Sequence, residues 1–244
     1  MVIDGGGTPD GSFDPGERIV APFLWKMKNR GVDYLVNSHP HPDHLQGLIF
    51  LLENFEIGKV WNNGEEAEDA SLTERFLTLA SGRLQTMGRE EGAQRIGGVQ
   101  VEFLHPPLIR KKGEILWGND ASLVLRLTYG EVSFLFAGDI ESSAEGEILK
   151  SGVNLRSTVL KVPHHGSKTS STESFVKAVR PQYAVFTVRG GTRPRLPNAA
   201  VLDRYEAMGT KVLRSDQHGA ITFVTDGKDL RVETYLKTGI GISP

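Results

Sequence analysis

The most informative stretch of the chain reads Ser38-His39-Pro40-His41-Pro42-Asp43-His44, and residues 39–44 hold three of its seven histidines. The stretch follows a predicted buried strand at residues 34–37 and leads into a predicted helix. In an extended chain, residues two apart point to the same side, so His39 and His41 can face one metal ion. Asp43 and His44 lie where the chain turns into the helix, and they can face a second ion beside the first.

The ligand types and the composition narrow the kind of metal site. Imidazole and carboxylate groups suit Zn, Mn or Fe. The 244 residues include no cysteine, which excludes a Cys-ligated zinc, an iron–sulfur cluster and a disulfide scaffold. Apolar residues make up 39% and the formal net charge is −2, which is typical of a globular protein and argues against nucleic-acid binding through overall charge. No apolar run approaches the length of a membrane span.

A two-ion site needs further ligands, and two other predicted strands end in suitable residues. The apolar residues 134–137 run into Gly138-Asp139. There a carboxylate either bridges two ions or simply forms a turn. The strand predicted at residues 158–162 runs into a His-His pair, and either His164 or His165 can complete the second ion.

The segment before a predicted β-hairpin offers a weaker candidate. The hairpin is predicted from residues 122–129 and 132–137, which flank the turn Gly130-Glu131. Just before it, Asn119 or Asp120 either supplies a weak oxygen ligand or forms a simple turn. Strands and helices alternate along the chain while hairpins are frequent, which favours mixed sheets with helices outside over a purely parallel wound sheet.

Together these segments resemble the metallo-β-lactamase superfamily. The resemblance is carried by Ile3-Asp4-Gly5-Gly6, the His-x-His-x-Asp-His sequence at residues 39–44, Gly138-Asp139 and the histidine after the strand at residues 158–162. Within the superfamily the chain looks most like the C-terminal lactamase-like nuclease domain of the ComEC competence proteins, on the strength of residues 39–48, 119–125, 160–167 and 216–221. The resemblance covers essentially the whole chain.

The resemblance implies an α+β fold of the αββα type, which is a four-layer sandwich of two mixed β-sheets flanked by helices. Residues 1–244 are then a single metallo-β-lactamase-like domain that lacks its first strand or strands. The start at Met1-Val2-Ile3-Asp4 reads as the end of a strand. We therefore expect the chain to be a piece of a longer protein or a shortened relative.

The resemblance also implies a hydrolase site with two divalent metal ions, Zn or Mn. It assigns its ligands as follows: His39 and His41 to the first ion, Asp43 and His44 to the second, Asp139 as the bridge, and His164 or His165 to complete the second ion. Of these two histidines we expect His164, which is closer to the strand end, to be the ligand. His165 is then a catalytic or supporting group.

Three further places in the sequence are interpreted through the resemblance. Asp4 steadies the metal loop. The third histidine that usually binds the first ion is missing, and Asn119 or Asp120 occupies roughly its place, with Asp120 the expected metal ligand. Members of the family often carry a His-Pro pair where this chain has Leu196-Pro197. This difference weakens any catalytic role for that loop.

The implied activity is that of a metal-dependent DNase, which degrades the strand that is not taken up during natural transformation. Two ions can clamp a phosphodiester and activate a water molecule. Asp43 or the bridging Asp139 is expected to orient the attacking hydroxide, while Lys161, Lys168 or a non-ligating His165 stabilises the transition state or protonates the leaving oxygen. The alternative is a hydrolase of another ester, such as a small phosphodiester, a lactone or a β-lactam, because the fold alone does not fix the function.

The charge pattern agrees with an anionic substrate. Residues 161–195 contain seven cationic residues and one acidic residue. Among them, Lys168, Arg193 and Arg195 are the expected phosphate contacts. The expected partners are single- or double-stranded DNA and, in a full-length parent, a membrane channel domain. The resemblance places the chain in an extracytoplasmic domain of a bacterial membrane protein, and we expect the chain itself to make no membrane contact.

Overall fold

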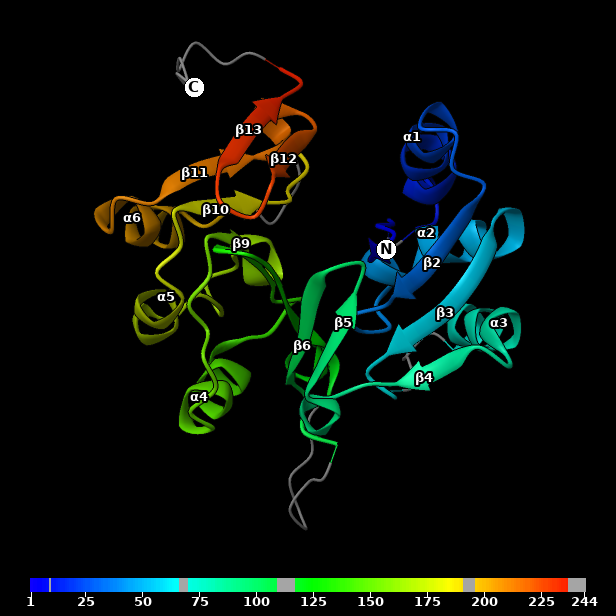
Figure 1. Ribbon diagram of the computed structural model, residues 1–244, viewed down its shortest axis with the longest axis horizontal. Helices are drawn as coiled ribbons and strands as arrows, with labels where there is room; N and C mark the ends of the chain where they lie inside the picture. Colours follow the sequence, from blue (N-terminus) through cyan, green and yellow to red (C-terminus); the bar gives the residue numbers. More distant parts are fainter. Residues whose placement is uncertain (9, 66–69, 109–116, 191–195, 237–244) are drawn as a thin grey trace. The chain divides into compact units, whose positions relative to one another are not determined.

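The computed structural model describes residues 1–244 except 9, 66–69, 109–116, 191–195 and 237–244 (Figure 1). The chain divides into two compact units, which are described separately. Unit 1 comprises Met1–Glu90 and Pro106–Leu123, and unit 2 comprises Glu91–His105 and Val124–Pro244. That the whole chain acts as one domain stays a prediction.

Unit 1 is built on a four-stranded sheet in the order β1-β2-β3-β4, whose pairings are all parallel. Its elements are β1 (Val2–Ile3), η1 (Gly16–Val20), α1 (Ala21–Lys26), β2 (Gly31–Val36), α2 (Pro42–Asn54), β3 (Glu56–Asn62), α3 (Ala70–Ala80), β4 (Leu84–Thr86) and the 3₁₀ turn η3 (Gly118–Ala121). A further 3₁₀ turn, η2 (Arg89–Glu91), follows β4. Buried side chains of β2 and β3 pack with those of the helices, for example Leu35 and Val60 with Leu48 and Phe76.

Unit 2 is built on a seven-stranded sheet in the order β11-β10-β9-β8-β7-β6-β5, and this sheet is mixed. The pairs from β5 to β8 are antiparallel, and those from β8 to β11 are parallel. Its strands are β5 (Ala93–Ile96), β6 (Val99–His105), β7 (Val124–Tyr129), β8 (Val132–Phe136), β9 (Val159–Lys161), β10 (Tyr183–Phe186) and β11 (Lys211–Arg214). A separate two-stranded sheet consists of β12 (Ile221–Thr225) and β13 (Leu230–Thr234). The helices and turns are α4 (Ser142–Lys150), η4 (Pro163–Gly166), α5 (Glu173–Val179), α6 (Ala199–Ala207) and α7 (Ser215–His218).

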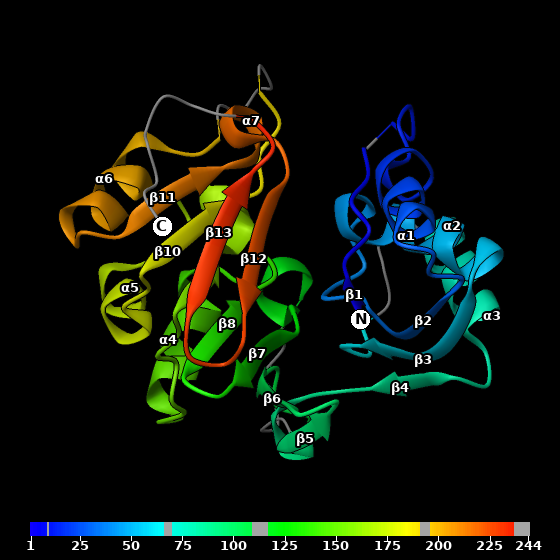
Figure 2. The same ribbon diagram turned by 45° about the horizontal axis from the view of Figure 1, so that its top comes forward.

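The two faces of the second sheet are covered differently (Figure 2). On one face, Leu135 and Leu160 pack with buried residues of α4, α5 and α6. On the other, the hairpin β12–β13 places the ring of Phe223 5.8 Å from Phe134 and 5.5 Å from Tyr183. Because successive side chains of a strand point to opposite faces, Phe134 and Leu135 serve opposite layers.

The predicted hairpin of residues 122–137 is confirmed as β7 and β8. Sheets flanked by helices are also as expected, although the mixed pairing is confined to unit 2. The first sheet is parallel because each of its strands returns through a helix or a long crossover rather than a tight turn. In each unit, polar residues follow the carboxyl ends of strands, and these are the candidate functional residues of that unit.

Candidate functional site

In unit 1, the three histidines of the 38–44 stretch come together after strand β2. His39 Nε2 lies 3.1 Å from His41 Nδ1. The rings of His39 and His44 have their centroids 4.2 Å apart. His39 lies in the loop, and His44 lies in the first turn of α2, where Pro42 at the start of the helix fixes the backbone. Both His39 and His44 are buried.

Asp4 holds this histidine group from the end of strand β1. Its Oδ1 accepts the backbone N–H of Ser38 at 2.7 Å, and its Oδ2 accepts the Ser38 hydroxyl at 2.8 Å. The same Oδ2 lies 2.7 Å from His44 Nδ1. Since a carboxylate only accepts hydrogen bonds, His44 carries its proton on Nδ1 and keeps the lone pair of Nε2.

The Ser38 hydroxyl extends the same arrangement to His39. Because that hydroxyl donates to Asp4, it accepts from His39 Nδ1, which lies 3.1 Å away. His39 then keeps the lone pair of its Nε2 as well. Histidines that bind metals typically donate their other ring N–H to such a partner. The outer contacts therefore leave both Nε2 atoms in the form that a metal ion requires.

The turn η3 is tied to the histidine group within unit 1. Leu123 N donates to Ser38 O at 2.7 Å, and the buried Asn63 donates through Nδ2 to Ala121 O at 2.9 Å. A Cβ atom on Gly118 would lie 3.6 Å from His41 Nε2. Asn119 and Asp120 thus belong to a turn beside His41. Asn63 was not among the residues expected from the sequence, because it directly follows β3, whose residues Glu56–Asn62 are only partly apolar.

Asp43 is the more open member of the unit 1 group. It lies in the first turn of α2, its Oδ2 is 3.9 Å from His44 Nε2, and its side chain is 42% exposed. A carboxylate at this position is reachable by a ligand while the histidines beside it are buried.

In unit 2, Asp139 and the two adjacent histidines follow neighbouring parallel strands. β8 and β9 pair in parallel, so the residues after their carboxyl ends meet at one edge of the sheet. His165 Nε2 lies 3.3 Å from Asp139 Oδ2. Lys161 Nζ donates to Asp139 Oδ1 at 3.2 Å and to Gly138 O at 3.0 Å. Asp139 is buried.

A left-handed backbone turns His164 and His165 in different directions. Their φ angles are 45° and 53°, which non-glycine residues adopt rarely. His165 Nδ1 lies 2.6 Å from Thr187 O, so this nitrogen carries a proton, and Nε2 faces Asp139 Oδ2. His164 Nδ1 instead lies 2.9 Å from Glu141 Oε1. An imidazole nitrogen and a carboxylate that face each other, as in His165 and Asp139, are typical of ligands arranged around a cation.

Comparison with known proteins identifies the family. The model of the metallo-β-lactamase superfamily matches residues 1–188. The chain belongs to the metallo-β-lactamase superfamily. It is 29% identical to ComE operon protein 3 of Bacillus subtilis, over 91% of this chain and 30% of that protein. It is 34% identical to Competence protein ComA of Neisseria gonorrhoeae, over 84% of this chain and 27% of that protein.

The chain therefore spans less than a third of the length of these two curated relatives. Among solved structures, a mutant of the CmlA beta-hydroxylase has a TM-score of 0.50 and 15% identity, over 76% of this chain and 43% of that one. This similarity concerns the fold alone, which is the metallo-β-lactamase fold with sheets flanked by helices.

The residues of both units fit the divalent metal ions that the superfamily implies. The unit 1 group offers imidazole nitrogens and one carboxylate, and the unit 2 group offers an imidazole nitrogen and a buried carboxylate. In each group an outer contact fixes a histidine ring: Asp4 and Ser38 in unit 1, and the Thr187 carbonyl in unit 2. This donor set suits transition ions better than Mg²⁺, which prefers oxygen ligands and water.

The cationic residues of segment 161–195 in unit 2 have different surroundings in the structure. Lys161 contacts Asp139, and Lys168 is exposed three residues beyond His165. Lys177 forms an ion pair with Glu173 at 2.5 Å on α5. Arg180 precedes the amino end of β10, so it lies at the sheet edge opposite to Asp139. Arg193 and Arg195, the expected phosphate contacts, lie outside the described residues.

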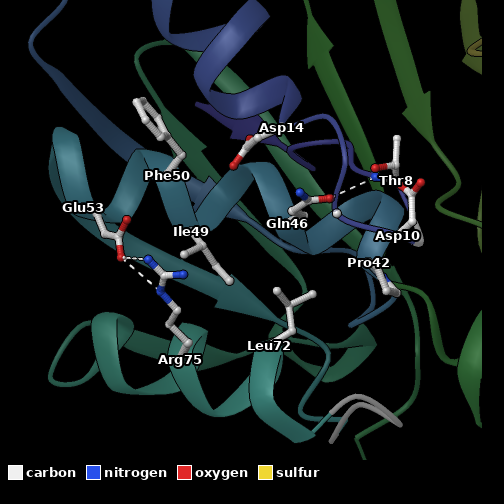
Figure 3. A pocket seen from close by; sticks show the side chains of 11 residues that line it. Thr8, Asp10, Asp14, Pro42, Gln46, Ile49, Phe50, Glu53, Leu72 and Arg75 are labelled. Atoms are coloured by element: carbon white, nitrogen blue, oxygen red, sulfur yellow. Dashed lines mark hydrogen bonds and ion pairs between the residues drawn. The ribbon is translucent and has the colours of Figure 1, made fainter.

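A cavity of about 370 Å³ lies beside Pro42 and Gln46 of α2 (Figure 3). The Gln46 side chain accepts the backbone N–H of Thr8 at 2.9 Å. The charged residues of its lining are Asp10, Asp14, Glu53 and Arg75, and Arg75 is already paired with Glu53. Hydrogen bonds from Ser12 lower the pKa of Asp10 to about 2, so the lining is anionic at neutral pH. This cavity does not suit a phosphate group.

Proposed function

We propose that the chain is a metal-dependent deoxyribonuclease of the ComEC type. It hydrolyses phosphodiester bonds in the DNA strand that is not transported during natural transformation. The proposal rests on the histidine–carboxylate group found in each unit, taken together with the similarity of the chain to competence proteins. In a full-length parent, the partner is a membrane channel domain, and the chain acts on the outer side of the membrane.

The proposed ligands are His39, His41, Asp43 and His44 from unit 1, with Asp139 and one of the two adjacent histidines from unit 2. Asp120 is a further candidate beside His41. When bound, two divalent ions, Zn or Mn, polarise the phosphodiester and lower the pKa of a water molecule.

The contacts in unit 2 favour a division of roles between the two histidines that reverses the expectation from the sequence. We assign His165 as the ligand, because its Nε2 faces Asp139 and its Nδ1 is fixed by a carbonyl. We assign His164 as the group that donates a proton to the leaving oxygen. Its contact with Glu141 holds the ring in place.

The cationic and acidic residues of the chain have separate tasks in this proposal. Lys161 holds Asp139 in position rather than contacting the substrate directly. Lys168, which is exposed, contacts a phosphate group of the DNA. Asp43, the exposed carboxylate of unit 1, orients the attacking water.

The test is cleavage of labelled single- and double-stranded DNA by the purified chain with Mn, Zn or Mg. We expect cleavage with Mn to exceed that with Mg, and Asp43→Ala and Asp139→Ala each to abolish it. Lys177→Ala, which removes only an exposed ion pair, is the matched control and should keep full activity. Activity on a lactone or a β-lactam with none on DNA would favour the alternative hydrolase, and full cleavage by Asp139→Ala would refute the two-ion mechanism.

A further inference from the structure

The helical segment of η1 and α1 has an apolar face that the described residues leave uncovered. Ile19 is 58% exposed, Phe23 61% and Met27 58%. On the opposite side, Ala21 and Leu24 are buried in the core of unit 1 with residues of α2. The helix is thus fixed by one face while the other presents large apolar side chains, an arrangement that usually marks an interaction surface.

Trp25 lies about 200° around the helix from Phe23, on the other flank of the buried residues Ala21 and Leu24. Its ring stacks on Phe55 with the centroids 5.5 Å apart and an interplanar angle of 15°. Trp25 nevertheless remains 51% exposed. The stacking holds the ring in place, so little rotamer freedom is lost when its open side is covered. Tryptophan is typical of surfaces that sit at the boundary between water and lipid.

The same segment is strongly cationic. Arg18, Lys26, Lys28 and Arg30 are all exposed, and residues 18–30 include no aspartate or glutamate. The chain as a whole has a net charge of −2, so this concentration of positive charge is local. Long basic side chains next to an apolar stripe can extend toward anionic groups while their stems cover apolar surface.

We propose that this α1 face, formed by Ile19, Phe23 and Met27 with the four cations, binds the surface of an anionic lipid bilayer. The apolar side chains enter the boundary between headgroups and acyl chains, and the cations pair with lipid phosphates. Among the described residues, no helix is long and apolar enough to cross a bilayer. This inference reverses the expectation that the chain makes no membrane contact, and it does not depend on the proposed nuclease activity.

Charge and side-chain type favour lipid over the other possible occupants. A second copy of the chain would bring four cations against four cations across a symmetric interface, which is unfavourable. Single-stranded nucleic acid is bound by aromatic rings that stack on bases. The α1 face offers one uncovered aromatic ring, Phe23, beside Ile19 and Met27, which do not stack, and Trp25 has one ring face already covered.

The experiment measures binding of the full chain to vesicles of phosphatidylcholine alone or with phosphatidylglycerol, by flotation in the presence of a chelator and without DNA. We expect binding to the anionic vesicles only. Ile19→Ser with Phe23→Ser should weaken it at least about tenfold, since the two side chains together contribute more than about 1.4 kcal/mol when buried. Lys26→Gln with Lys28→Gln should weaken it on the order of twentyfold, at about fivefold for each lysine.

The matched control is Tyr235→Ser with Leu236→Ser, which removes two exposed apolar residues from unit 2 and should leave binding unchanged. Thermal unfolding of each variant verifies that it folds, as expected for residues on the surface of the chain. Equal binding by the Ile19 and Phe23 double variant would overturn the proposal. The proposal would also be overturned if the wild type does not bind vesicles but self-associates or binds DNA, and the double variant loses that property.

Discussion

The two adjacent histidines of unit 2 contact different groups, and this difference predicts which one binds metal. His165 faces Asp139, and His164 faces Glu141. We expect the wild-type chain reconstituted with Zn or Mn to hold about two ions. His165→Ala should lose at least one of them and His164→Ala should retain both, as measured by elemental analysis after gel filtration. Loss of metal from His164→Ala alone would restore the assignment expected from the sequence.

Asp4 acts on the histidine group without needing to touch a metal ion. Asp4→Asn keeps the size of the side chain but loses the carboxylate charge and the pair of oxygens that accept hydrogen bonds from Ser38 and His44. We expect metal affinity to fall about 10- to 100-fold, as is usual when the outer partner of a histidine ligand is removed. Competition with a chromogenic chelator measures this change. Asp33→Asn, an exposed change in the same unit, is the control and should keep the wild-type affinity.

At the scale of elements, α2 and the glycine loop after β1 approach each other too closely for side chains. A Cβ atom on Gly47 would lie 2.2 Å from Gly5 O. We expect Gly47→Ala to destabilise the chain by several kcal/mol, on the order of an overpacked core. Gly146→Ala in α4 has nothing within 4 Å of the new atom. That variant should be neutral or stabilise by up to about 1 kcal/mol, because alanine favours helix. Urea unfolding distinguishes the two variants, and equal effects would contradict the predicted steric clash.

A second element-scale contact joins α4 to the start of α5. The buried Glu145 carboxylate accepts the backbone N–H groups of Ser171 at 2.5 Å and Thr172 at 2.7 Å. Burial raises the pKa of Glu145 above its ordinary value of 4.5. A group whose pKa is higher in the folded state stabilises most below its unfolded pKa, and this contribution is lost as pH rises through the folded value.

Glu145→Gln removes this titration and one hydrogen-bond acceptor, which costs about 1–3 kcal/mol. Only the wild type loses the stability contribution of a protonated Glu145 as the pH rises above about 4.5. The difference in unfolding free energy between the two proteins should therefore narrow over that range. Unfolding free energies measured at several pH values test this. A gap that widens with pH would mean that the folded-state pKa is lowered instead.

At the scale of the whole molecule, DNA binding should depend on a few exposed cations rather than on net charge. Lys168→Ala should weaken binding to DNA of any sequence and lower the salt slope by about 1, because one phosphate contact is lost. Lys177→Ala lies in the same basic segment but removes a lysine that is paired with Glu173, so it should change neither value. Fluorescence anisotropy over a range of salt concentrations measures both. Equal losses in the two variants would point to diffuse charge attraction.

The sequence by itself determined the histidine group, the superfamily and most of the elements. The 38–44 motif carries enough information because its ligands are close along the chain and their spacing fixes which side they face. Strands β4 and β5 were missed. Both are short edge strands with polar residues, Leu84-Gln85-Thr86 and Ala93-Gln94-Arg95-Ile96, so they lack the apolar pattern that identifies interior strands.

Only the tertiary structure decided what surrounds these groups. Sequence spacing cannot distinguish His164 from His165, because their directions depend on two left-handed residues and on partners 22 or more residues away. It also could not distinguish the buried side of α1 from the uncovered side, since Leu24 and Phe23 are equally apolar and only packing against α2 separates them. Contacts between distant segments set burial and ring orientation, and these contacts exist only in the folded chain.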